Sequence, residues 1–493
     1  MSTSLSSDFE VLEDTKPDDM SLPPFMVSTA RGFLPRIDPI AALPSEFDAV
    51  ESILQRMPIR TLSGKPGLLA KDKLGDTILQ ELPDLTAEID KYRENLPMVT
   101  ALYRDYSFLA SAFLLEPCHT RFMNGDPYGL GRSFLPAQLS RPIVRCAELA
   151  GFKPFMEYAG SYALFNYRLE NPDQGLEYSN LRLIRAFEHG LDPTSSEAGF
   201  VLVHIDMVKN SGRLVQGVMS CFAALANGEQ HPSSPQQQRI DFNKGLSTVV
   251  SAMQDVNDVM ETMWKKSKPR SYQSFRTFIF GITSQSMFPS GVVYEGVNDN
   301  QPLDFRGESG ANDSIVPLMD NFLAVPMPDT PLTEILRDFR SYRPSNHRAF
   351  LERVKERSED LCLKDFALAL APARGTDEDE DAVRDSRVLW LRALDQVRDF
   401  RWRHWCFARE YILKRTSHPT ATGGSPIVTW LPNQLQAVME EMVNLGSRID
   451  GMSSGMDLGS EYRDIMDRVE RQRDTLSKEV EKYCQERGVK SPC

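Results

Sequence analysis

Two histidines lie on apolar helix faces, where an imidazole could act as a ligand. His404 lies in the segment 397–411, in which apolar side chains recur at positions 397, 400, 408 and 411 with helical spacing. A lone histidine on such a face is more often a buried structural residue than a ligand. The functional interpretation is an axial heme ligand, because heme needs an imidazole that projects from a rigid helix into an apolar cavity.

The second candidate, His204, lies in the apolar segment 199–208 beside Phe200, Met207 and Val208. Zinc usually takes three or four ligands, often histidines at positions i and i+4, and neither histidine has such a partner. Two isolated histidines on separate apolar helices therefore favour heme over a structural metal. The other five histidines are interpreted as solvated or structural: His119, His189, His231, His347 and His418.

Arg276 is the third candidate, flanked by aromatic residues in the predicted helix 271–282. One interpretation is a surface arginine whose stem packs on apolar neighbours. The functional alternative is a clamp for a carboxylate in an aromatic pocket, because a guanidinium binds a carboxylate with two parallel hydrogen bonds.

Helical periodicity dominates the elements that must position these residues. Strand signals are sparse, so the sequence predicts an all-α protein. Residues 1–44 are polar and contain prolines, which predicts a loosely attached arm, and prolines and glycines predict a loop over 116–142. The acidic segment 373–381 is interpreted as a solvated insertion rather than a partner site. The main predicted helical segments are 46–112, 142–150, 155–168, 198–226, 241–265, 271–282, 317–324, 332–342, 347–360, 382–414, 432–446 and 459–487.

Composition narrows the function classes. The 493 residues carry a net charge of −13, with 41% hydrophobic and 25% charged residues. This balance fits a folded globular protein and argues against binding to nucleic acid or anionic membranes. The seven cysteines form no CxxC pair, and neither a secretory signal nor a membrane-spanning run is found. We therefore expect a cytoplasmic protein, as a monomer.

The segments that carry these residues, together with the blocks between them, resemble the indoleamine 2,3-dioxygenase family, and the length and insertions are most similar to fungal members. Order and spacing agree from about residue 45 to 440. The matching blocks are Gly291-Val292-Val293-Tyr294-Glu295-Gly296, Phe305 with Ser309-Gly310, Arg340-Ser341-Tyr342-Arg343-Pro344, His347-Arg348-Ala349-Phe350-Leu351, His404 with Tyr411-Ile412, and Thr422-Gly423-Gly424.

The resemblance implies an all-helical heme dioxygenase fold in which a smaller N-terminal domain covers a larger domain holding heme b. We expect an arm at 1–44, the smaller domain at 45–170, the heme domain at 171–450 and a charged C-terminal helix at 451–493. The implied activity is cleavage of the indole C2–C3 bond of tryptophan to N-formylkynurenine, the first step of the kynurenine pathway, which feeds NAD synthesis. Dioxygen is the implied co-substrate, and the partner is a small indole amino acid.

The resemblance also assigns roles to residues. His404 falls on the proximal iron ligand, and Arg276 on the arginine that binds the substrate carboxylate. Arg401 and Asp320 fall on a charged pair near the heme propionates, and the segment Ser309-Gly310-Ala311 on the loop over the heme. Thr422-Gly423-Gly424 falls on the loop that closes over substrate. The remaining implied pocket residues are Tyr158, Ser161, Tyr162, Phe200, Val201 and either Ser271 or Tyr272.

Two positions depart from the family pattern. His204 replaces a small hydroxyl residue of animal members; an imidazole there could bond the indole N–H or dioxygen, or coordinate the iron. Glu308 replaces a glycine and adds a charge near the pocket. These departures leave two alternatives open: a paralogue that cleaves another indole, or a heme-binding signalling protein with little turnover.

Overall fold

Long helices dominate the computed structural model, which describes residues 3–6, 9–230, 234–327, 331–369, 380–416, 418, 420–452 and 458–489. The all-α prediction is confirmed, because within these described ranges strands form only three small sheets. The α-helices are α1 (Asp48–Arg56), α2 (Leu74–Glu81), α3 (Thr86–Ile89), α4 (Leu96–Met123), α5 (Ala137–Ala150), α6 (Ser196–Val208), α7 (Ser211–Gln230), α8 (Pro235–Glu261), α9 (Met263–Lys266), α10 (Pro269–Arg276), α11 (Ile315–Phe322), α12 (Pro331–Arg340), α13 (Ser345–Asp360), α14 (Leu363–Leu368), α15 (Glu380–Phe407), α16 (Ile427–Met452) and α17 (Gly459–Arg487).

The strands are short and connect loops rather than build a core. Strand β1 (Thr3–Ser6) pairs antiparallel with β2 (Phe9–Val11), and β4 (Tyr167–Leu169) with β5 (Leu181–Leu183). Strand β6 (Val292–Tyr294) lies between β3 (Phe134–Leu135), which is parallel to it, and β7 (Pro302–Leu303), which is antiparallel. Two π-helical turns matter below: η4 (Tyr158–Tyr162) and η10 (Ala408–Leu413), which continues α15.

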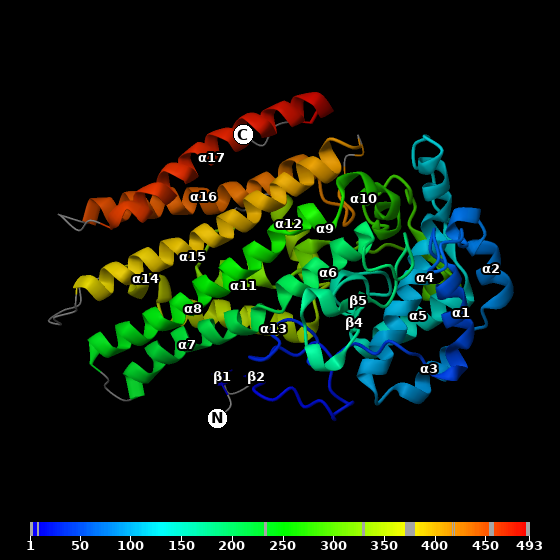
Figure 1. Cartoon of the computed structure of the whole chain (residues 1–493), viewed down its shortest axis with the longest axis horizontal. Coiled ribbons are helices and arrows are strands. Elements are labelled where there is room, and N and C mark those ends of the chain that lie inside the picture. The colour runs from blue at the N-terminus through cyan, green and yellow to red at the C-terminus, as the bar shows by residue number, and fades with distance from the viewer. Residues whose placement is uncertain are drawn as a thin grey trace.

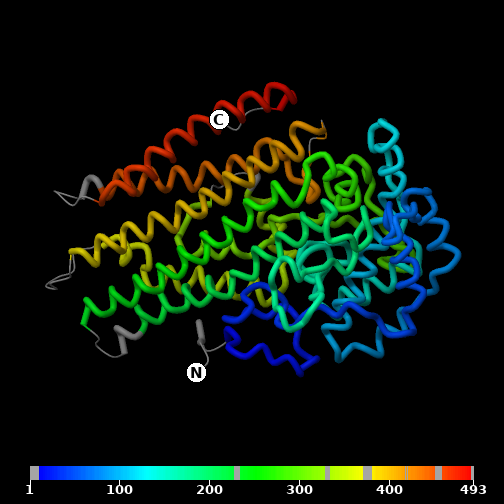
Figure 2. Tube along the Cα trace, viewed as in Figure 1, coloured from blue at the N-terminus to red at the C-terminus, as the bar shows by residue number. Residues whose placement is uncertain are grey.

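Helices α1 to α5 gather at one end of the molecule, and the long helices α7, α8, α15, α16 and α17 run side by side through the larger body (Figure 1). The trace in Figure 2 shows the same arrangement, with the C-terminal helix along one edge. Most packing between these long helices joins α7 to α8, α8 to α15, and α16 to α15 and α17. The core is thus built from segments far apart in the sequence.

Helix α4 is the buried axis of the smaller end. Its N-cap is Asn95, whose side chain accepts a hydrogen bond from the Met98 N–H at 3.1 Å. Asp105 on this helix is completely buried and accepts hydrogen bonds from Arg104 (2.8 Å) and Arg185 (2.7 and 2.9 Å). Burial alone would raise the pKa of Asp105, but these two guanidinium groups outweigh burial and hold the pKa below its ordinary value.

We expect Asp105→Asn to lower the free energy of unfolding at pH 7 by about 3–5 kcal/mol, because the buried Arg104 loses its counter-charge and Arg185 keeps only Glu51. A carboxyl with a depressed folded pKa stabilises the fold above its unfolded pKa of about 3.9 and loses this contribution as the pH falls toward the folded value. Urea unfolding should therefore show a constant gap between variant and parent above about pH 5, which narrows in acid. The exposed Asp255, paired with Arg213, is the matched control; its asparagine variant should change stability by less than about 1 kcal/mol.

The predicted loop at 116–142 is wrong at both ends. Helix α4 continues through Pro117 to Met123, and α5 begins at Ala137. A proline inside a helix leaves the carbonyl four residues earlier without its partner. Here that carbonyl belongs to Phe113, and the Arg132 guanidinium donates to it instead. Burial of α4 and this substitute donor together allow the helix to pass the proline.

The predicted arm is also not loosely attached within its described part. Phe33 is fully buried, and its N–H donates to the Ser211 hydroxyl at 2.9 Å. The Val27 N–H donates to the Asn346 side chain at 2.8 Å. The arm is therefore fixed to the larger body at α7 and α13. The predicted helix 155–168 is replaced by η4 and strand β4, because the Glu157 side chain caps the turn by accepting the Gly160 N–H.

Helices α6 and α15 carry the two candidate histidines. Ser195 caps α6 by accepting the Ala198 N–H at 3.1 Å. Gly199 lets α6 lie directly against α9, since a Cβ at this position would fall 1.9 Å from the Lys266 carbonyl oxygen. Helix α15 packs along α8, and α17 supports it from outside, where the Trp405 indole N–H donates to Glu479 of α17 at 2.7 Å.

Most of the acidic insertion 373–381, and His231, lie outside the described residues. None of the described helices is both long enough and apolar enough to cross a membrane.

Candidate functional site

Two cavities meet at His404. One of about 400 Å³ lies between α11, α12, α13 and α15, and one of about 170 Å³ lies between α6, α10, α15 and the loop before α16. His404 lines both of them, as do Gly310, Ala311, Asp313, Phe400, Trp430 and Leu431. We call the first the basic cavity and the second the apolar cavity, after the side chains that line them.

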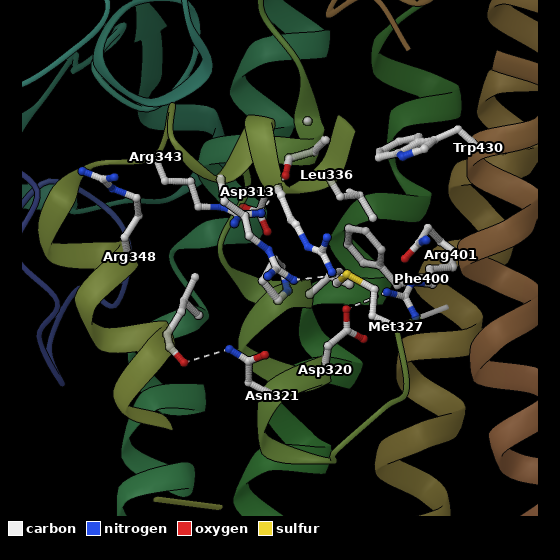
Figure 3. A pocket seen from close by; sticks show the side chains of 18 of the residues that line it. Asp313, Asp320, Asn321, Met327, Leu336, Arg343, Arg348, Phe400, Arg401 and Trp430 are labelled. Carbon is white, nitrogen blue, oxygen red and sulfur yellow. Dashed lines mark hydrogen bonds and ion pairs between the residues drawn. The ribbon is translucent and has the colours of Figure 1, made fainter. Parts of the chain in front are cut away.

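The basic cavity collects cations from distant segments. Its cationic lining residues are Arg337, Arg340, Arg343, Arg348, Lys355 and Arg401. Arg401 donates to Asp320 at 2.7 Å, and Figure 3 shows this pair facing each other, with Phe400 beside Arg401. No described residue accepts a hydrogen bond from the buried Nε of Arg343 or of Arg348, or from Nη1 of Arg401. These unsatisfied donors fit an anionic group.

The apolar cavity has aromatic and thioether walls. Phe200, Tyr272, Phe400, Phe407, Tyr411 and Trp430 contribute rings, and Met207, Met260 and Met263 contribute thioethers. The polar side chains that reach it are few, among them His204, Glu308, Ser309, Asp313 and Thr422. A cavity of this kind suits a flat aromatic ligand with a small number of polar contacts.

His404 and His204, which both line the apolar cavity, are neutral imidazoles. Burial, with a smaller contribution from the positive form of His204, lowers the pKa of His404 to about 4. Burial also lowers the pKa of His204. Nδ1 of His204 lies 2.8 Å from the Phe200 carbonyl oxygen, which can only accept, so Nδ1 carries the proton and Nε2 keeps a free lone pair. His404 likewise has the neutral imidazole that a metal ligand requires.

Arg276 lies directly behind the apolar cavity rather than on its wall. It is completely buried, donates to the Thr420 carbonyl at 3.2 Å, and lies over the Phe280 ring at 4.6 Å. Its Nε and Nη1 have no hydrogen-bond partner among the described residues. Burial raises the pKa of the Tyr272 hydroxyl, and the adjacent Arg276 guanidinium partly offsets that rise. Tyr272 thus separates an unsatisfied cation from the cavity.

The loop before α16 closes one side of the apolar cavity. The Thr422 hydroxyl donates to the Glu308 carbonyl at 2.8 Å, and the Thr422 carbonyl accepts the Gly281 N–H at 2.9 Å. Gly423 does not line the cavity, but a Cβ there would meet the Phe339 ring at 2.6 Å, so this close approach requires glycine. The loop is therefore seated against the segment that contains Ser309 and Gly310.

Two predicted substrate contacts lie away from the cavity walls. The Ser161 hydroxyl is used inside η4, where it contacts the Glu157 N–H at 2.8 Å and the Glu157 carbonyl at 2.7 Å. The Tyr158 ring packs against the His204 ring from behind, and its hydroxyl donates to Asp313 at 3.4 Å. Neither side chain is among those that line the two cavities, and their contacts with a substrate stay predictions.

Several lining residues were not assigned a role from the sequence. Arg340 and Arg343 belong to the block 340–344, which matches the family pattern, and this match could have pointed to them. Asp313, Met260 and Trp430 had no distinguishing pattern, because each comes from a different segment. Burial raises the pKa of Asp313 to about 6 and lowers that of Arg343 to about 10.

The lining residues fit heme. A single neutral imidazole faces the junction of the cavities, the apolar walls suit a macrocycle, and the unsatisfied guanidinium donors of the basic cavity suit its two propionates. No group of three or more metal-ligating His, Cys, Asp or Glu side chains occurs in the described part of the chain, so a multi-ligand metal centre has no support there.

Comparison with known proteins identifies similar chains. The sequence model of the indoleamine 2,3-dioxygenase family matches residues 21–448, so that α17 lies beyond the match. Indoleamine 2,3-dioxygenase nanC of Aspergillus nanangensis is 24% identical over 418 residues, covering 83% of this chain and 91% of the relative. The Saccharomyces cerevisiae indoleamine 2,3-dioxygenase is 24% identical over 381 residues (73% and 77%). The 6-hydroxytryptophan 2,3-dioxygenase fscD of Fusarium equiseti is 22% identical over 335 residues (67% and 73%).

Proposed function

The chain belongs to the indoleamine 2,3-dioxygenase family, whose members are heme-dependent dioxygenases, and from this premise we propose that it cleaves the indole C2–C3 bond of tryptophan to give N-formylkynurenine. The observation that carries the proposal is the position of His404, where a basic cavity suited to propionates meets an aromatic cavity suited to indole. His404 holds the heme iron, and Arg340, Arg343 and Arg401 neutralise the propionates. Bound heme supplies the activation of dioxygen.

The protein's own side chains bind and orient the substrate. Phe200 and Tyr272 line the apolar cavity with their rings 5.3 Å apart and hold the indole by aromatic contacts. Arg276 gives up the Thr420 carbonyl and donates its free N–H groups to the substrate carboxylate. Fixing the indole in one orientation contributes much of the rate, and the seated Thr422 loop excludes water.

The test is conversion by the heme-loaded protein. We expect the protein to bind one heme per chain. Each N-formylkynurenine formed should consume one L-tryptophan and one dioxygen. Tryptophan binding without product at any substrate concentration would overturn the assignment and favour a heme-binding signalling role.

A second candidate is the same cleavage of another indole. The observation that favours it is Glu308, a buried carboxyl on the cavity wall, together with a relative that acts on 6-hydroxytryptophan. A higher kcat/KM for 6-hydroxytryptophan than for tryptophan would select this alternative.

His204 has a role that can be tested separately. Because Nδ1 is held by the Phe200 carbonyl, Nε2 is free to accept a hydrogen bond from the indole N–H. We expect His204→Ser to lower kcat/KM for tryptophan by about fivefold to tenfold, the value of one hydrogen bond. The loss should be absent for 1-methyltryptophan, which has no indole N–H. A low-spin ferric spectrum in the parent that is lost in the variant would contradict this role and indicate coordination of iron by His204.

A further inference from the structure

Glu308 is a carboxyl placed in the wall of the apolar cavity without a protein partner. The residue is only 4% exposed, and it lines the cavity beside Ser309 and Gly310. Its backbone carbonyl is bonded by the Thr422 hydroxyl, which fixes the residue against the loop. No described residue donates a hydrogen bond to its carboxyl oxygens. A buried polar group in this state is costly unless a ligand completes it.

The cavity supplies no cation to Glu308. Neither lysine nor arginine occurs among the described residues that line it. Burial alone accounts for the raised pKa of Glu308, about 8, with no contribution from a neighbouring positive charge. The other carboxyl on the wall, Asp313, differs, because it accepts hydrogen bonds from the Ile315 N–H at 2.8 Å and the Tyr158 hydroxyl at 3.4 Å. The ligand must therefore bring the positive charge for Glu308.

Glu308 and Arg276 border the same short segment of the loop. Arg276 donates to the carbonyl of Thr420, and the carbonyl of Glu308 accepts from Thr422, two residues further on. Arg276, behind Tyr272, and Glu308, on the cavity wall, are thus held by neighbouring residues of one loop, and the charges of both act on the pKa of the Tyr272 hydroxyl between them. An α-amino acid carries its carboxylate and its ammonium on the same carbon atom, so it matches this placement of opposite charges.

We propose that Glu308 binds the α-ammonium of the substrate and makes the site selective for zwitterionic indole amino acids over indole acids that lack the amine. This inference rests on the proposed function and adds the recognition of the amino group to it. Glu308 acts in binding and specificity, and it takes no part in breaking the indole bond.

The test compares ligands with and without the amine in the heme-loaded, oxygen-free enzyme. Dissociation constants for L-tryptophan and indole-3-propionate are measured by calorimetry for the parent and for Glu308→Gln. We expect the variant to bind tryptophan at least about 30-fold more weakly, as when one partner of a buried charge pair is removed. Binding of indole-3-propionate should stay within about threefold or become tighter, because a carboxyl with no partner in that complex has been neutralised.

Controls separate recognition from a structural effect. Glu308→Asp should recover part of the tryptophan affinity. Glu441→Gln, at a buried carboxyl that lines neither cavity and pairs with Lys364, should leave the ratio of the two dissociation constants unchanged. An equal loss of affinity for both ligands in Glu308→Gln would overturn the proposal. 6-Hydroxytryptophan is measured as a third ligand. A loss of affinity confined to it would place its ring hydroxyl at Glu308 and would also overturn the proposal. A parent enzyme that binds neither ligand would overturn the proposed function itself, whereas normal binding with an unchanged variant would overturn only the role of Glu308.

Discussion

Replacing His404 with alanine should abolish stoichiometric heme binding and, with it, all dioxygenase activity. The imidazole projects from α15 into the junction of the two cavities, where no other described histidine except His204 reaches the walls. Loss of a residue that merely supports a ligand typically lowers metal affinity 10- to 100-fold, so loss of the ligand itself should cost more than about 100-fold. The Soret absorption and the heme-to-protein ratio after gel filtration give the measurement.

Chemical rescue makes this prediction specific. In His404→Gly, added imidazole should restore the Soret band, because the missing group is returned to the same space. His189→Ala, a change at a partly exposed histidine on the surface, is the control and should keep full heme content. A normal Soret band in His404→Ala would show that the proximal assignment is wrong.

The second large effect is expected from Arg276→Ala. The buried guanidinium lies behind Tyr272 with two nitrogens that have no hydrogen-bond partner, and its removal deprives the substrate carboxylate of a bidentate partner. A loss of about 3 kcal/mol corresponds to a kcat/KM for tryptophan reduced by about 100-fold, with heme content unchanged. Arg276→Lys should recover little, since an ammonium cannot form the two parallel hydrogen bonds.

Arg276 also holds the Thr420 carbonyl, so the variant could act through the loop. Tryptamine, which lacks the carboxylate, separates the two effects. The parent and Arg276→Ala should handle tryptamine equally if the arginine binds carboxylate. A similar loss for both compounds would assign Arg276 to the loop instead.

The helical class and the placement of His404 and His204 on cavity-facing helices followed from local patterns. Periods of three and four residues describe a helix face directly, and both helices face the same cavity. The continuation of α4 through Pro117 did not follow, because the group that replaces the lost backbone donor, Arg132, comes from outside the helix. Burial of α4 outweighed the helix-breaking tendency of the proline.

Some site residues could not be predicted, again because their contacts come from distant parts of the chain. Ser161 was expected at the substrate, but its hydroxyl is consumed by the Glu157 backbone, a contact that depends on the turn type. The basic cavity draws on four stretches of the chain, around Asp320, Arg343, Arg401 and Trp430, and no periodicity connects them. Glu308 was visible as a departure from the family pattern, but its lack of a partner is a property of the folded chain.

The contact between α17 and α15 connects the docking of the C-terminal helix with the helix that carries the heme ligand. Trp405, the neighbour of His404, and Arg409 both bind Glu479 of a helix that lies beyond the family match. If docking of α17 holds the ligand helix in its binding geometry, then thermodynamic reciprocity requires bound heme to favour the docked helix by the same factor. The affinity of this chain for its cofactor is then set partly by an element outside the common core, so relatives with the same lining residues can differ in how readily they lose heme.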